Sequence, residues 1–326
     1  MLSINLTLII NERYNFSLQK LSIIIPCYNE QDTIQSFLEA TQKVELELKN
    51  QLLFNYIFIN DGSKDATLTV LRQVSDQFRN VHYLSFSRNF GKEAALFAGL
   101  EAADGDLVTV MDVDLQDPPE LIIDMYRKIQ EGYDVVGTRR ADRKGEPPIR
   151  SFFSKLFYKI INTVSDTEMV DGARDFRLMT RQVVDSILKL QEVNRFSKGL
   201  FSWVGYDVTY ISYENRERIA GETSWNFWSL LKYSMDGFIN FSEAPLSISL
   251  WAGAGSFLMS IIGILFIIGR KLIFGDNVTG WASLVCIMLF IGGIQLLALG
   301  VIGKYISKIF LETKKRPVYI IKEKDK

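Results

Sequence analysis

The sequence predicts an α/β domain built on a mostly parallel sheet, followed by two membrane-spanning helices. The first part of this prediction rests on residues 21 to 138, where short β-branched runs alternate with segments of helical periodicity. The second part rests on residues 244 to 269 and 277 to 303, which contain no charged residue. Each uncharged stretch is longer than the roughly 20 residues that a helix needs to cross a bilayer.

The strands and helices of the α/β part follow one another in regular order. The predicted strands are residues 21 to 26, 54 to 60, 81 to 86, 107 to 111 and 133 to 138. The predicted helices between them are residues 31 to 49, 65 to 79, 92 to 103 and 118 to 131. This repeat predicts a sheet covered by helices on both faces, with ligands bound beyond the carboxyl ends of the strands.

The predicted domain organisation divides the chain into six parts. Residues 1 to 20 form an extension with no assigned role, and residues 21 to 222 form the α/β domain. Residues 139 to 150 are charged and contain prolines, so we expect a mobile loop over the site. The remaining parts are residues 223 to 243, 244 to 269, 277 to 303 and 304 to 326, which belong to the membrane region.

The two uncharged stretches are predicted to form a hairpin, because only residues 270 to 276 separate them. Lysine and arginine are more frequent after the second stretch than in this short link, so the positive-inside rule places both flanks in the cytoplasm. Residues 225 to 241 and the segment after residue 304 show amphipathic spacing and are predicted to lie in the membrane interface. The alternatives are buried core helices of a soluble protein for the hairpin, and an ordinary core helix for residues 225 to 241.

Composition excludes several classes of function. The 37 Lys and Arg residues balance 38 Asp and Glu residues, which leaves a net charge of -1 and speaks against a nucleic-acid partner. The only cysteines, Cys27 and Cys286, are far apart, which excludes a disulfide framework and a cysteine-based zinc site. His82 is the only histidine, so most histidine-centred metal sites and catalytic triads are excluded.

Polar clusters follow three of the predicted strands. The first two clusters are residues 26 to 30 and residues 60 to 63, whose carboxylates could accept hydrogen bonds from a base or a ribose. The alternative is that Asp61 and Ser63 only cap the helix that follows. In the third cluster, alternate residues of an extended chain would present Asp112, Asp114 and Gln116 to one side, as oxygen ligands for Mg²⁺ or Mn²⁺.

A fourth cluster spans residues 171 to 178. Asp175 lies between Arg174 and Arg177, and Arg195 and Lys198 follow further along the chain. By sequence alone, a structural salt bridge is the favoured interpretation of this pattern.

Together these clusters resemble the family 2 glycosyltransferases of the GT-A fold, and within them the membrane-anchored polyprenyl-phosphate glycosyltransferases related to dolichol-phosphate mannose synthases. The similarity extends over about residues 20 to 320. It is carried by IPCYNE, INDGSKD, LSFSRNFGKEAAL, DVDLQDPPEL, GTRR, DFRLM, NRFSKGLFSWVG and the run from residue 221 to 228. One departure is Asn60, where many relatives have a second aspartate, so hydrogen bonding to the base could differ.

The resemblance implies a role for each candidate residue. Asp175 matches the acceptor-side aspartate, as catalytic base or as electrostatic partner. The implied ligands of Mg²⁺ or Mn²⁺ are Asp112, Asp114 and Gln116. The implied nucleotide-sugar contacts are Pro26, Tyr28, Asn29, Glu30, Asp61, Ser63, Arg88, Lys92 and Asp112. The implied phosphate contacts are Arg139, Arg140, Arg177, Arg195 and Lys198.

The activity that the resemblance implies is an inverting, metal-dependent transfer of a sugar from a nucleotide sugar to undecaprenyl phosphate, for modification of cell-envelope glycans. UDP-glucose and UDP-N-acetylglucosamine are the expected donors, and the site would lie at the cytoplasmic face of the cell membrane. Relatives associate through their membrane helices, so a homo-oligomer such as a tetramer is expected. The alternatives are a processive polysaccharide synthase, whose QxxRW motif this chain lacks, and a membrane-tethered nucleotide-sugar sensor.

Overall fold

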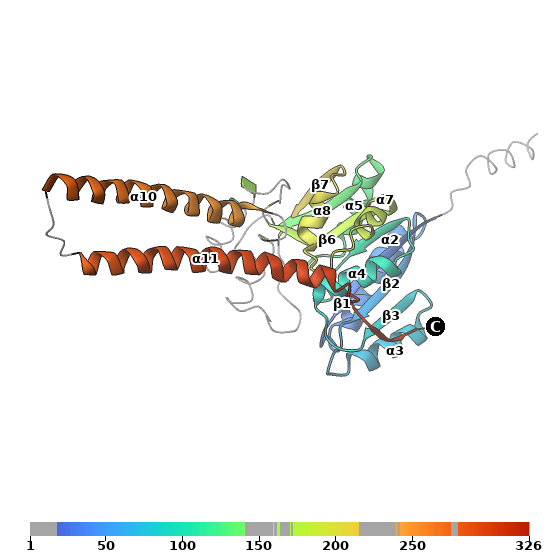
Figure 1. The fold of residues 1–326 in the computed structure, drawn as a ribbon. Coiled ribbons are helices and arrows are strands. Elements are labelled where there is room, and N and C mark those ends of the chain that lie inside the picture. Colours follow the sequence, from blue (N-terminus) through green and yellow to red (C-terminus); the bar gives the residue numbers. More distant parts are fainter. Residues whose placement is uncertain are drawn as a thin grey trace, which may run out of the picture.

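The computed structural model describes residues 18–140, 159, 162–163, 170, 172–214, 239, 242–274 and 280–325. The predicted loop at 141–150 and nearly all of the predicted interfacial helix at 225–241 lie outside these residues. The described residues form one eight-stranded sheet and a long helical hairpin that extends away from it (Figure 1).

The sheet is mixed and mostly parallel, as predicted, with the order β7-β5-β6-β4-β1-β2-β3-β8. Its strands are β1 (Gln19–Cys27), β2 (Leu52–Asn60), β3 (Val81–Phe86), β4 (Leu107–Val110), β5 (Val135–Arg140), β6 (Ala173–Thr180), β7 (Val208–Tyr213) and β8 (Ile321–Lys324). The pairs β1–β2, β1–β4, β2–β3 and β5–β7 are parallel, whereas β6 and β8 run antiparallel to their neighbours. The five predicted strands are confirmed, and β6, β7 and β8 were not predicted.

Helices cover both faces of the sheet. On one face lie α2 (Ile34–Leu48), α3 (Thr67–Gln77) and α5 (Leu121–Gln130), and on the other lie α4 (Lys92–Ala102), α7 (Arg181–Leu188) and α8 (Ser197–Trp203). Successive residues of a strand point to opposite faces. Ile23 and Ile25 accordingly pack with the first set of helices, and Ile24 packs with the second.

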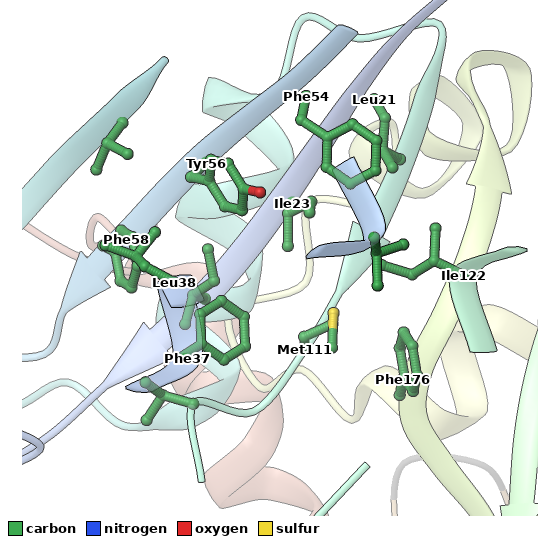
Figure 2. Close-up of a cluster of buried hydrophobic side chains, with 14 of the residues drawn as sticks. Leu21, Ile23, Phe37, Leu38, Phe54, Tyr56, Phe58, Met111, Ile122 and Phe176 are labelled. Carbon is green, nitrogen blue, oxygen red and sulfur yellow. The ribbon is translucent and has the colours of Figure 1, made fainter. Parts of the chain in front are cut away.

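The core on the first face is rich in aromatic residues (Figure 2). Phe37 of α2 meets Phe58 of β2 edge to face, with ring centroids 6.1 Å apart. Tyr56 is fully buried, and its hydroxyl donates a hydrogen bond to Glu45 at 3.0 Å. Both strands of this core, β1 and β2, therefore have fixed positions up to their carboxyl ends.

On the second face, α4 approaches β1 closely because it carries small residues. A Cβ atom added at Gly99 would lie 2.1 Å from Cγ2 of Ile24. Contacts below about 3 Å require the neighbour to move, so only glycine fits here. This close contact fixes the height of α4 above the sheet and therefore the position of its first residue, Lys92.

The hairpin consists of α10 (Ala244–Phe274) and α11 (Trp281–Thr313), which lie side by side (Figure 1). The stretches Ala244–Arg270 and Ile287–Thr313 are long and apolar enough to span a membrane, and their most apolar windows are not buried in the protein. A soluble core helix would be buried, so this alternative is not supported. The helix α11 continues without a break to Thr313, past residue 304, where a separate interfacial helix was predicted.

The C-terminal segment returns to the sheet as β8, which pairs with the edge strand β3. Both oxygens of the Glu323 carboxylate accept hydrogen bonds from Arg72, at 2.6 and 2.7 Å. Nearby, Tyr319 stacks on Phe86, with ring centroids 5.0 Å apart. The tail therefore covers the edge of β3 and connects the end of the hairpin to the α/β domain.

A second connection joins α11 to the segment between α7 and α8. The carboxylate of Glu312 accepts the backbone N–H groups of Val193 and Asn194, at 3.0 Å. The ammonium of Lys308 donates to the side-chain oxygen of Asn194 at 2.7 Å. The cytoplasm-side end of the hairpin, in the predicted topology, is therefore held against the α/β domain.

The close approach of α4 to the sheet can be tested at Gly99. We expect Gly99→Ala to destabilise the protein by ~1–3 kcal/mol, because the added methyl group collides with Ile24. Ile24→Ala should relieve part of this collision, so the double variant should lose less stability than the sum of the two single variants. Thermal unfolding of all four proteins checks this, and strict additivity would contradict the proposed contact.

The connection at Glu312 can be tested by Glu312→Ala. Two backbone N–H groups would lose their acceptor, which we expect to cost ~1–3 kcal/mol. Hydrogen–deuterium exchange should rise at residues 192 to 196 and remain unchanged in α2. Unchanged exchange at 192 to 196 would show that Glu312 does not hold this segment.

Candidate active site

The carboxyl ends of β1 and β2 are joined by hydrogen bonds between the two loops that follow them. The N–H of Asn29 donates to the hydroxyl of Ser63 at 2.9 Å, and its side-chain oxygen accepts the N–H of Lys64 at 2.8 Å. The N–H of Glu30 donates to Thr67 at 2.9 Å. Asn29 has a positive φ of 57°, a conformation that asparagine tolerates better than most residues. These predicted site residues are therefore brought together.

Beside these loops, Tyr28 is 43% exposed and Pro26 is the penultimate residue of β1. An exposed aromatic ring at the carboxyl edge of a sheet offers a face on which a base can stack. The surroundings of Tyr28 agree with the nucleotide role that the resemblance implies, and no contact of the structure tests it.

Asp61 holds the loop between β3 and α4. Its two carboxylate oxygens accept the N–H groups of Phe90 and Gly91, at 2.6 and 2.9 Å. Burial raises the pKa of Asp61, and these two hydrogen bonds together with the charge of Arg88 partly offset this effect. The alternative that Asp61 caps α3 is wrong, because Asp65 accepts the N–H of Thr67 there.

Asn60, the departure from the family pattern, has a structural role in this chain. Its side chain is almost fully buried. The amide oxygen accepts the N–H of Ser63 at 3.1 Å, and the amide nitrogen donates to Ser85 at 3.0 Å. An aspartate could accept both bonds if the Ser85 hydroxyl donated instead, but it would bring a negative charge into a nearly fully buried position.

The chain turns after β4 and is not extended, which corrects the expected alternation of Asp112, Asp114 and Gln116. β4 ends at Val110, and Leu115 has a positive φ of 55°. The N–H of Gln116 donates back to Asp114 at 3.2 Å. The three side chains therefore do not follow the simple alternation of a strand, because the backbone reverses between them.

The unpredicted strand β6 explains how Asp175 reaches this edge of the sheet. β6 runs antiparallel to β4, with Val110 opposite Arg177. Asp112 lies two residues after Val110 and Asp175 lies two residues before Arg177, so both are close to the end of this pairing. Two carboxylates that are 63 positions apart in the sequence thus lie next to each other, which the linear spacing of the motifs could not reveal.

Lys92 lies between these two carboxylates. Its ammonium is 2.7 Å from one oxygen of Asp112 and 3.0 Å from the other, and it is 2.8 Å from Asp175. Burial lowers the pKa of Lys92, but the two carboxylates outweigh burial and raise the pKa above its usual range. The lysine is therefore a permanent cation of the site.

The pKa of Asp175 is strongly displaced. Burial alone would raise it, but Lys92, Lys198 and Arg177 together hold it well below its usual range. A carboxylate with a lowered pKa is a weak base. The arrangement therefore favours Asp175 as an electrostatic or positioning group over Asp175 as a proton acceptor.

A cluster of hydrogen-bonded side chains around the buried Asp117 stabilises the turn after β4. Asp117 is 2% exposed and accepts hydrogen bonds from Arg174, at 3.3 Å, and from the hydroxyl of Tyr213. The guanidinium of Arg174 also donates to the side-chain oxygen of Gln116 at 3.4 Å. Asp117 and Tyr213 were not predicted as site residues. Asp117 belongs to an acidic run, but nothing in the sequence marks Tyr213.

The predicted phosphate-binding residues differ in their contacts. Arg177 packs over the ring of Phe201 at 3.8 Å and is 5% exposed, and Lys198 lies close enough to Asp175 to lower its pKa. Arg195 is buried, packs over Phe97 at 4.3 Å and donates to the carbonyl of Leu190 at 2.5 Å. These contacts are those of a structural arginine.

Arg139 and Arg140 belong to β5, which corrects the predicted start of the loop at residue 139. Arg139 donates to the hydroxyl of Ser212 at 2.9 Å, and Arg140 lies opposite Tyr213 in the pairing with β7. On the other side of the site, Arg88 packs over Phe90 at 4.0 Å.

The donor chemistry at the end of β4 fits a hard divalent cation in part. Asp112 and Asp114 supply carboxylate oxygens, and Mg²⁺ is commonly held by one or two carboxylates together with substrate phosphates. The side-chain oxygen of Gln116 accepts from Arg174 at 3.4 Å and has a second lone pair for a cation, so its predicted role as a ligand stays a prediction. Within the described part of the chain, no three His, Cys, Asp or Glu side chains are grouped to hold a metal by themselves.

The charge state of Asp175 gives a prediction for stability. Its folded pKa is below the unfolded value of about 3.9, so the ionised carboxylate stabilises the fold above that value and loses this effect as the pH falls through the folded pKa. We expect Asp175→Asn to be less stable than the parent protein at pH 7, on the order of 1–2 kcal/mol. This difference should shrink between about pH 5 and pH 3.

Thermal unfolding at several pH values measures the difference. Asp124→Asn, on an exposed surface of α5, controls for the loss of one carboxylate. A difference that stays constant with pH at Asp175 would contradict the assigned charge state.

Comparisons with known proteins agree with the geometry. The family model for glycosyl transferase family 2 matches residues 22–188. CsbB of Bacillus subtilis (strain 168) is 46% identical over 305 residues, which cover 93% of this chain and 91% of that protein. The bactoprenol glucosyl transferase of Shigella phage SfV is 42% identical over 310 residues, which cover 94% of this chain and 100% of that protein.

Among solved structures, a mannosyltransferase from Pyrobaculum calidifontis in complex with GDP-Man and Mn²⁺ superposes with a TM-score of 0.47 at 14% identity. The superposition covers 90% of this chain and 85% of that one, and it is too loose for a correspondence of residues. The family model covers more than half of the chain, and the two sequence relatives match nearly its whole length. The chain therefore belongs to glycosyltransferase family 2 and is an enzyme of that family.

Proposed function

We propose that this enzyme transfers a sugar from a nucleotide sugar to a polyprenyl phosphate at the cytoplasmic face of the cell membrane. The observation that carries the proposal is the convergence of Asp112, Asp175 and Lys92 at the carboxyl edge of the sheet, in a chain whose helical hairpin exposes apolar surface. This edge is where α/β sheets bind ligands. UDP-glucose or UDP-N-acetylglucosamine is the proposed donor.

The acceptor part of the proposal is supported by the names of relatives. Several relatives about 42% identical are bactoprenol glucosyl transferases, and the matches cover nearly their full length. A hairpin of two apolar helices would keep the α/β domain at the surface of the bilayer, where the phosphate of a polyprenyl lipid resides. A nucleotide sugar is soluble in the cytoplasm, so the two substrates would meet there.

The proposed nucleotide-sugar site consists of the loops after β1 and β2 and the loop before α4. It includes Tyr28, Asp61 and Arg88, around the hydrogen bonds that join these loops. A divalent cation held by Asp112 and Asp114 would neutralise the charge that develops on the diphosphate leaving group.

The proposed mechanism is a single displacement with inversion at the anomeric carbon. A lipid monophosphate has a second pKa of about 6, so its attacking oxygen is already anionic near neutral pH and needs no strong base. Asp175, with its lowered pKa, would remain ionised throughout. Its charge would then orient the cationic groups around it and stabilise the positive charge of the sugar ring in the transition state.

Radiolabelled transfer tests the proposal. Purified protein is incubated with undecaprenyl phosphate, Mg²⁺ or Mn²⁺, and each member of a panel of UDP and GDP sugars, with and without EDTA. We expect labelled lipid from one donor, loss of the product on chelation, and a loss of at least about 100-fold in Asp114→Asn and Asp175→Asn.

Asp124→Asn, on the exposed surface of α5, is the matched control and should transfer at the parental rate. Binding of a nucleotide sugar without labelled lipid from any donor would refute the acceptor and favour a sensor. Full activity of both Asp114→Asn and Asp175→Asn would refute the proposed site.

A further inference from the structure

Lys92 occupies the position at which positive charge is required when no substrate is bound. Its ammonium contacts both oxygens of Asp112, at 2.7 and 3.0 Å, and one oxygen of Asp175 at 2.8 Å. One of these carboxylates, Asp112, is also a proposed cation ligand. The same carboxylate therefore has two possible positive partners, one supplied by the protein and one from solution.

The position of Lys92 is fixed by contacts on both of its sides. The preceding residue, Gly91, has a φ of 99° and donates its N–H to Asp61 at 2.9 Å. The following residue, Glu93, accepts the N–H of Ser197 at 3.0 Å and the hydroxyl of the same residue. The backbone on either side of Lys92 is therefore held by Asp61, which follows β2, and by Ser197 at the start of α8. The flexible side chain of Lys92 can still change partners.

The two negative charges of Asp112 and Asp175 favour a cation between them. Two ionised carboxylates in contact with one ammonium lie close together, and without that ammonium they would repel each other. The side chains are partly accessible, with 38% of Lys92, 29% of Asp112 and 20% of Asp175 exposed. A small cation from solution can therefore reach Asp112 without unfolding of the site.

We propose that Lys92 is a positioning residue that makes binding of the divalent cation depend on the nucleotide. Without nucleotide, its ammonium occupies Asp112 and disfavours the divalent cation. When a nucleoside diphosphate enters, its phosphate oxygens provide another partner for the ammonium, and Asp112 becomes available to the cation. The inference rests on the proposed function, because it assumes that a nucleoside diphosphate binds at this edge.

The consequence is an ordered site. The cation binds together with the nucleotide, and Asp175 keeps its contact with Lys92 in both states. Among the described residues, Lys198 lies near Asp175 but forms no ion pair with Asp112, so it would act on the cation only through longer-range electrostatics.

The experiment measures Mn²⁺ binding by the electron paramagnetic resonance signal of free Mn²⁺, with the full-length protein in nanodiscs, with and without UDP, and with GDP in a parallel series. For the parent protein, we expect weak binding alone and much tighter binding with the nucleotide. In Lys92→Gln and Lys92→Met, we expect about tenfold tighter binding without nucleotide and a smaller gain when nucleotide is added. Lys92→Arg retains the positive charge and should keep part of the dependence on nucleotide.

Lys198→Gln is the matched control, because it removes one positive charge near Asp175 without removing a contact of Asp112. It should tighten Mn²⁺ binding less than Lys92→Gln does. An equal effect of the two variants, or an unchanged nucleotide dependence in folded Lys92→Gln, would overturn the proposal. Thermal unfolding shows which variants are folded. Lys92→Arg provides the comparison with a variant that keeps a positive charge at this position.

The same preparations are assayed for sugar transfer to undecaprenyl phosphate. Absence of transfer by the parent protein, combined with the expected Mn²⁺ behaviour, would refute the proposed acceptor and leave the role of Lys92 intact. Transfer by the parent protein, combined with no effect of Lys92 on Mn²⁺ binding, would refute the role of Lys92 alone.

Discussion

The carboxylates of Asp112 and Asp175 both contact one ammonium, that of Lys92, which offsets their mutual repulsion. Asp112 follows β4 and Asp175 lies in β6, which pairs with β4, and the ammonium contacts both carboxylates. Charge repulsion would otherwise oppose this register at the end of the sheet. The charge balance of the candidate site therefore depends on Lys92, the first residue of α4. The position of α4 is as important to the site as the positions of the strands.

The position of α4 is in turn connected to the end of the helical hairpin. Glu312 of α11 holds the backbone before α8, and Ser197 at the start of α8 bonds to Glu93, the neighbour of Lys92. Gly99 lets the same helix lie close to β1. This series of contacts runs without a gap from α11 through α8 to α4. It explains why the site and the hairpin keep a defined relative position.

The sequence predicted the parallel half of the fold well, because β-branched runs and helical periodicity report directly on strands and helices that are buried. It missed β6 and β8 for a physical reason, and it missed β7 although Val208, Tyr210 and Ile211 are residues typical of a strand. β6 is rich in arginine and lies in a charged cluster, and β8 is a short strand at the edge, where an apolar pattern is not required. The nearness of Asp112 and Asp175 depends on the register of β6, so the spacing of motifs could not predict it. The expected alternation after β4 failed because the backbone turns at Leu115.

The site contains two kinds of positive charge, and they have different mobility. Arg174 is bound to the buried Asp117, and Arg177 packs over Phe201, so both guanidinium groups act as fixed parts of the scaffold. Lys92 is different, because a flexible side chain carries its ammonium and its contacts are partly exposed. Arginine suits fixed, planar contacts, whereas lysine is a compact charge on a flexible stem. A site that must accept a highly charged diphosphate and later release it needs at least one cation able to change partners, and among the described cations in contact with Asp112 only Lys92 meets this requirement.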